Sequence, residues 1–116
     1  MSNQNYRRGA NFERKVKKWY EDKGDFVVRS AGSHSPVDLV VLRYGQTVLV
    51  QCKIDGKLPE EEEMALRKVA TDHNCVAHLA YKGKAGIEIK IISMGYPEWE
   101  IQPWFPKEVH EEEPRA

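Results

Sequence analysis

Three polar residues in the first half of the chain could act together on a phosphodiester bond. Asp38 lies near the start of one run of β-branched residues, and Gln51 and Lys53 lie near the end of the next. Because side chains alternate along a strand, Gln51 and Lys53 share one face and Cys52 points to the other. A carboxylate can hold a divalent cation that activates water, while a lysine stabilises charge growing on phosphorus. The set predicts metal-dependent phosphodiester hydrolysis.

These residues need two neighbouring strands to bring them together. The runs 37–42 and 47–54 are separated by Arg43-Tyr-Gly-Gln46, which predicts an antiparallel hairpin. Val48 and Val50 share the face of Cys52, so we expect that face to pack into the core. Gln51 and Lys53 would then lie on the opposite face, one strand away from Asp38.

Further elements surround the hairpin. Phe12, Val16 and Tyr20 recur with helical spacing, which predicts a helix over about residues 8–23 that Gly24 ends. The remaining runs predict strands at 26–30, 75–81 and 87–92 and a helix at 59–72. The order helix, three strands, helix, two strands indicates an α/β domain with a central mixed sheet of about five strands, flanked by helices.

The second helix begins with an acidic run. Pro59 suits a first helical turn, and Glu60–Glu63 complement the positive end of the helix dipole. Consecutive helical residues point in different directions, so we interpret these glutamates as dipole complement and solubility rather than as a metal cluster. Met64, Leu66 and Val69 are expected to pack inward.

Length and composition indicate one small domain. The chain has 116 residues, of which 41% are hydrophobic, and so small a core often gains from oligomerisation. We expect one domain over residues 1–106 and a disordered acidic tail over 107–116. The sequence has neither a long apolar run nor a secretory signal, and Cys52 and Cys75 are expected to be reduced thiols. A cytoplasmic protein is expected, or one in the host cytoplasm if it is viral.

Charge is divided unevenly along the chain although the net charge is +0. Residues 1–58 carry eleven Lys or Arg and six acids, whereas residues 59–116 carry seven and twelve. Such asymmetry is typical of a polyanion-binding face beside an acidic segment. A solvated surface would also explain it.

Several motifs in order resemble one nuclease family. The segments are Arg8-Gly-Ala-Asn-Phe-Glu13-Arg14, Val27-Val-Arg-Ser-Ala-Gly-Ser-His-Ser-Pro-Val-Asp38-Leu-Val, Leu49-Val-Gln-Cys-Lys53 and Ala77-His-Leu-Ala-Tyr-Lys82. Together they resemble the PD-(D/E)xK nuclease superfamily and, within it, the archaeal-type Holliday junction resolvases. The resemblance covers about residues 7–93 and implies a restriction-endonuclease-like domain.

The resemblance also implies roles for single residues. Glu13 would be a helix-borne acid at the metal, Asp38 the central metal ligand and Lys53 the catalytic lysine. Ser33 would lie near the scissile phosphate. The resemblance further assigns contacts with the DNA backbone, which it gives to Arg8, Arg29 and Ser33.

Gln51 departs from the family pattern, which usually has Glu there. An amide oxygen can ligate a hard cation but brings no charge. We therefore count Gln51 with Glu13 and Asp38 as a metal ligand and expect weaker binding of Mg²⁺, or of Mn²⁺. A non-catalytic DNA-binding relic of the fold is the alternative.

Each residue has a simpler explanation. Glu13 has helical spacing to Lys17 and could be an ordinary solvated partner. Asp38, after Pro36, could only shape a turn, and Gln51 with Lys53 could be the solvent face of an edge strand. Their ordered combination favours a site.

The function implied by the resemblance is a homodimeric, structure-selective endonuclease that resolves four-way DNA junctions by paired symmetric nicks. The aromatic residues Trp99, Trp104 and Phe105 could cover the dimer seam. A different nuclease of the superfamily, acting on linear or branched DNA, is the other alternative.

Overall fold

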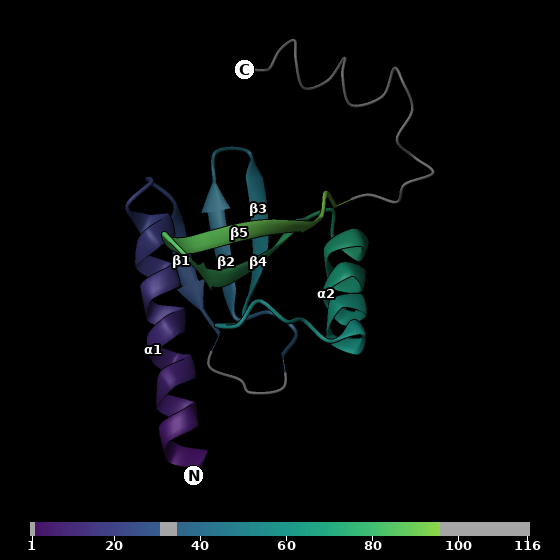
Figure 1. Ribbon diagram of the computed structural model, residues 1–116. Coiled ribbons are helices and arrows are strands. Elements are labelled where there is room, and N and C mark those ends of the chain that lie inside the picture. Colours follow the sequence, from purple (N-terminus) through teal and green to yellow (C-terminus); the bar gives the residue numbers. More distant parts are fainter. Residues whose placement is uncertain (1, 31–34, 96–116) are drawn as a thin grey trace.

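The computed structural model describes residues 2–30 and 35–95 (Figure 1). Seven elements follow one another in the expected order. They are α1 (Ser2–Glu21), β1 (Phe26–Arg29), β2 (Leu39–Arg43), β3 (Gln46–Cys52), α2 (Glu60–Asp72), β4 (Val76–Gly83) and β5 (Gly86–Ser93). The five strands form one sheet in the order β1-β2-β3-β4-β5, in which β3 and β4 run parallel and the other neighbours antiparallel. The expected α/β domain with a mixed five-stranded sheet is confirmed.

The two helices cover opposite faces of the sheet. Val48 and Val50 of β3 join the cluster under α1, whereas Leu49 between them joins the cluster under α2. The face of Val48, Val50 and Cys52 is a core face, as predicted. The opposite face is a core face as well, because α2 packs on it. Gln51 therefore lies in the interior, at the edge of the second cluster.

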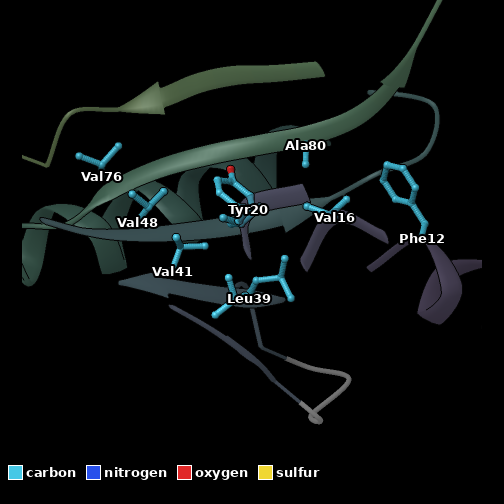
Figure 2. Close-up of a cluster of buried hydrophobic side chains, with 10 residues drawn as sticks. Phe12, Val16, Tyr20, Leu39, Val41, Val48, Val76 and Ala80 are labelled. Atoms are coloured by element: carbon cyan, nitrogen blue, oxygen red, sulfur yellow. The ribbon is translucent and has the colours of Figure 1, made fainter. Parts of the chain in front are cut away.

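Helix α1 packs through the predicted stripe. Phe12, Val16 and Tyr20 are buried against strand residues that include Leu39 and Val41 (Figure 2). The hydroxyl of Tyr20 lies 2.9 Å from Nδ1 of buried His78, so the hydroxyl and this ring nitrogen satisfy each other.

The start of α1 differs from the prediction. The helix begins at Ser2, several residues before the expected start near Arg8. Residues 4–8 are exposed, so the added turns carry no apolar periodicity that could have revealed them. At the other end, Gly24 adopts a left-handed φ of +98° just after the helix ends at Glu21.

Helix α2 packs through Leu66 and Ala70, one turn apart. Val69 is partly buried against the same cluster, as predicted. Met64 was expected to point inward, and this was wrong: its side chain is 60% exposed. Positions 64 and 66 lie on different sides of a helix, and docking through Leu66 turns Met64 to solvent.

The predicted hairpin is formed by β2 and β3, in register Leu39↔Val50 and Val41↔Val48. Its turn contains Gly45 with a φ of +70°. β3 ends at Cys52, earlier than the expected Ile54, but pairing with β4 continues, because the Lys53 amide donates to the Ala80 carbonyl at 3.0 Å. The backbone of Lys53 is thereby held by the sheet.

Neither helix in the described part of the chain is long and apolar enough to cross a membrane.

Candidate active site

A cleft of about 550 Å³ opens where the hairpin strands meet both helices. Its walls come from α1, the segment before β2, the end of β3 and the first turns of α2. The lining residues are Glu13, Ser35, Pro36, Asp38, Gln51, Cys52, Lys53, Glu61, Glu62 and Ala65. All four residues expected to carry chemistry, Glu13, Asp38, Gln51 and Lys53, line this one cleft.

Asp38 is anchored to the sheet just before β2 begins. Its backbone amide donates to the Val50 carbonyl at 2.8 Å, and its carbonyl accepts from the Ser30 amide at 2.8 Å. Its side-chain Oδ2 accepts from the Cys52 amide at 2.8 Å. Asp38 could have been a turn-forming residue, but these contacts hold it between β1 and β3 with its carboxyl group in the cleft.

Gln51 lies on the central strand and is only 8% exposed. This excludes the interpretation of Gln51 as part of a solvent face on an edge strand. One end of its amide lies 2.8 Å from the Pro36 carbonyl oxygen and 3.3 Å from Asp38 Oδ2, so a nitrogen at that end donates to both. With the amide turned the other way, its nitrogen lies 3.5 Å from Glu62 Oε1, at the limit of a hydrogen bond. The amide nitrogen therefore binds either Pro36 and Asp38 or Glu62, depending on which way the amide is turned.

Lys53 extends from the end of β3 towards α2. Its Nζ lies 2.8 Å from Glu62 Oε1, and the two side chains are 29% and 44% exposed. The amine and the partner carboxylate therefore lie at the mouth of the cleft, where both can still change conformation.

Glu13 reaches the cleft from α1 and is held by a strand. Its Oε1 accepts from Arg29 Nε at 2.9 Å, and both side chains are mostly buried. The simple alternative of a pair with Lys17 is not what the structure has, because Lys17 pairs with Glu21 at 2.6 Å.

Burial raises the pKa of Asp38 from its ordinary value near 3.8 to about 6. The Cys52 amide opposes this rise, the Glu13 carboxylate adds to it, and the Lys53 and Arg29 cations lower it. An acid whose ionised form is disfavoured by burial gains most from a positive charge brought next to it.

The side chains of the cleft determine whether a hard divalent cation could bind there. Among the described residues, no three His, Cys, Asp or Glu side chains converge into a ready-made metal centre. The Asp38 carboxylate and the Pro36 carbonyl converge on one end of the Gln51 amide, and Gln51 adds a third oxygen there when the amide is turned with its oxygen to that end. Oxygen is the donor that Mg²⁺ and Mn²⁺ prefer. Of the remaining carboxylates, Glu13 and Glu62 each hold a protein cation, and Glu61 also lines the cleft. The set fits such an ion once a carboxylate turns towards it.

Other predicted residues are placed differently or fall outside. Ser33 lies outside the described residues. Arg8 is exposed on α1, and Arg29 pairs with Glu13 rather than pointing freely to solvent. Sequence reasoning missed Ser35, Glu61 and Glu62. For Glu62 a signal existed, since it lies eleven residues after Gln51 in the chain, too few for the helix to start far from the end of β3.

Fold and site together define a class: α/β domains that carry an acid and a polar-x-Lys pair on a hairpin beside a helix-borne acid. The structure resembles that of Archaeoglobus fulgidus Hjc, a Holliday junction resolvase, with a TM-score of 0.63 and 23% identity over 73% of each chain. A segment of 52 residues is 44% identical to the crossover junction endodeoxyribonuclease Hjc of Methanocaldococcus jannaschii. That segment is 45% of this chain and spans 38% of the relative.

A family model, that of the archaeal Holliday junction resolvases (Hjc), matches residues 4–102. The chain belongs to this family. The resemblance drawn from the motifs is confirmed.

Proposed function

We propose that the chain is a Mg²⁺-dependent endonuclease that resolves four-way DNA junctions by two symmetric nicks. One observation carries the proposal: Glu13, Asp38, Gln51 and Lys53, which three separate segments supply, line a single cleft in a chain of this family. The named relatives, a Holliday junction resolvase and a crossover junction endodeoxyribonuclease, agree with this substrate.

The cleft residues divide the chemistry between them. Asp38, the Gln51 oxygen and Glu13 would hold the cation, which supplies Lewis acidity and an activated water. Lys53 reaches the mouth of the cleft, where its ammonium group can stabilise the negative charge that develops on the attacked phosphate. The Cys52 amide orients the Asp38 carboxylate by donating to Oδ2. Mn²⁺, which takes the same oxygen ligands, is expected to substitute for Mg²⁺.

Two further hollows indicate a path for the DNA backbone. The first adjoins the cleft at Lys53 and is bounded by Arg8. The second shares Arg8 with the first and reaches Lys15 on α1 and Lys82 on β4. A line of cations leading away from the catalytic lysine suits successive phosphates.

Arg8→Ala should weaken junction binding and reduce the slope of log affinity against log salt by about one. The matched control is Lys68→Ala, on α2, whose ammonium group already pairs with Asp72. Equal salt slopes for wild type and Arg8→Ala would show that the path does not pass Arg8.

A second copy of this chain is the proposed partner. α2 contacts β3, β4 and β5, whereas Phe26, Val28 and Leu42 on the neighbouring strands are 65%, 48% and 44% exposed. Phe26 and Leu42 are paired in register, so they form one apolar patch. A two-fold junction that is cut twice needs two sites in a two-fold arrangement.

Light scattering should give about twice the chain mass, and Phe26→Ser should shift the protein towards the monomer. A wild-type protein that stays monomeric, with DNA and without, and still makes paired nicks would refute the dimer. Trp99, Trp104 and Phe105, which were expected to cover the dimer seam, lie outside the described residues.

The central test compares a labelled four-way junction with linear duplex of the same sequence, with Mg²⁺ and with EDTA. We expect paired nicks in the junction only, and only with Mg²⁺. Equal cleavage of the linear duplex would indicate a different nuclease of the superfamily. Tight junction binding with no cleavage in Mg²⁺ or Mn²⁺ would indicate the non-catalytic relic of the fold. The observation that favours this alternative is Gln51.

A further inference from the structure

Glu62 touches two residues of the cleft although it belongs to neither hairpin strand. Its Oε1 lies 2.8 Å from Lys53 Nζ and 3.5 Å from the Gln51 amide nitrogen. It projects from the first turn of α2, whose four glutamates precede the buried Leu66. The ion pair with Lys53 thus brings one carboxylate next to the position where the family usually has an acid on β3, within 3.5 Å of the Gln51 amide.

The neighbouring glutamates are placed otherwise. Glu63 pairs with Arg67 at 2.9 Å, and Glu60 is exposed. Glu61 lines the cleft, but the contacts to Gln51 and Lys53 are made by Glu62. The acidic run therefore does not act as one cluster. Docking of α2 through Leu66 and Ala70 selects Glu62 from it.

The charge of the cleft points the same way. Asp38 and Glu13 bring two negative charges, Gln51 brings none, and Lys53 and Arg29 bring two positive ones. Divalent cations bind more tightly as charged oxygen ligands are added. Glu61 and Glu62 also line the cleft, and of these two it is Glu62 that contacts Lys53, so Glu62 is the better placed to add net attraction for a cation.

We propose that Glu62 supplies the carboxylate that Gln51 lacks, and that it does so by exchanging Lys53 for the divalent cation. The proposal rests on the metal-dependent function inferred above. At 44% exposure the Glu62 side chain can rotate from the mouth of the cleft towards the end of the Gln51 amide that faces Asp38. The same movement releases the Lys53 ammonium group, so that binding of the cation and liberation of the lysine are coupled.

The test measures Mn²⁺ binding in the absence of DNA, from the loss of the free-ion electron paramagnetic resonance signal. The proteins are wild type, Asp38→Asn, Glu62→Gln, Gln51→Glu, the double variant Gln51→Glu/Glu62→Gln, and Glu60→Gln as the control from the same helical turn. Glu62→Gln removes only a half-exposed ion pair, so the variant should fold. Thermal melting of each variant checks this.

We expect Glu62→Gln to weaken Mn²⁺ binding about tenfold or more and Glu60→Gln to change it by less than about twofold. Restoring the acid on β3 in the double variant should bring the affinity back to within about threefold of wild type.

Two results would overturn the inference and leave the proposed function standing. One is wild-type affinity in Glu62→Gln while Asp38→Asn loses binding. The other is a loss in Glu62→Gln that Gln51→Glu does not repair, since Glu62 would then act elsewhere. Failure of the function itself looks different: wild type binds no Mn²⁺, or Asp38→Asn binds it unchanged, and the inference then falls with the function.

Discussion

The two helices bring similar acids to the cleft in different ways. α1 packs through residues as deeply buried as Val16 and Tyr20, both 0% exposed, and its Glu13 is 21% exposed beside Arg29. α2 is shorter and carries four glutamates in its first turn, of which Glu62 is 44% exposed beside Lys53. One carboxylate is held in place by its surroundings, and the other is free to exchange partners. In the proposed site, one cation would therefore have a fixed ligand, Glu13, and an adjustable one, Glu62.

The largest effect is expected from replacing the carboxylate of Asp38. Asp38→Asn should reduce junction cleavage by about a thousandfold or more, about 4 kcal/mol of barrier, because Asp38 is the proposed central ligand of the cation. Junction binding should change little, because the cations along α1 remain. Rates are measured under single-turnover conditions. Cleavage within about tenfold of wild type would remove Asp38 from the chemistry.

The next effect separates the two acids at saturating Mg²⁺. Glu13→Gln should slow cleavage about a hundredfold, because a fixed ligand also orients the cation in the transition state. Glu62→Gln should cost less than about tenfold once the cation is saturating, since its main effect is on affinity. Equal losses in single-turnover rate would contradict the proposed difference between Glu13 as a fixed ligand and Glu62 as an adjustable one.

A smaller effect is expected from changes at Gln51. Gln51→Glu should lower the Mg²⁺ concentration at half-maximal cleavage by about threefold to tenfold, because it adds a charged oxygen at nearly unchanged size. Gln51→Ala should raise that concentration. The maximal rate should change less than the midpoint. Identical Mg²⁺ titrations for all three proteins would mean that Gln51 does not touch the cation.

The smallest effect is on stability and depends on pH. The Asp38 carboxyl has a pKa of about 6 in the fold against 3.8 ordinarily. Ionisation therefore opposes folding, by an amount that is absent below about pH 4 and complete above about pH 6. In EDTA at pH 8, Asp38→Asn should melt about 5 °C above wild type, with the gap closing towards pH 4. Glu62→Gln, which breaks an exposed pair, should shift the melting temperature by less than about 3 °C. A gap for Asp38→Asn that persists at pH 4 would rule out this cause.

Most of the fold could be predicted because its elements follow clear periodicities. The stripe of α1 and the β-branched runs gave seven elements in the right order. The prediction missed the first turns of α1, because their exposed residues show no apolar periodicity. It failed again at Met64, because α2 has few apolar residues and only its docking decides which of them turn inward.

The site was predictable to a similar extent. Alternation along the strand put Gln51 and Lys53 on one face, and the hairpin brought Asp38 beside them. The family motif added Glu13. The short link after Gln51 indicates that the glutamate run lies near the end of β3, but nothing in the run says which glutamate faces the strand. The choice of Glu62 therefore required the structure. The burial of Gln51 also required it, since a strand does not reveal from its own sequence that it is the central one.

The hairpin has a consequence for the order in which the protein assembles. Asp38 lies just before β2, and Gln51 and Lys53 lie at the end of β3. These strands pair antiparallel across a tight turn, and such local contacts form quickly. The parallel pairing of β3 with β4 forms later, because α2 connects the two strands and must first cross over the sheet. During refolding, protection of amide protons should therefore rise in the hairpin before it rises in β4. A folding intermediate would hold the inner residues of the cleft in place while Lys53 still lacked Glu62.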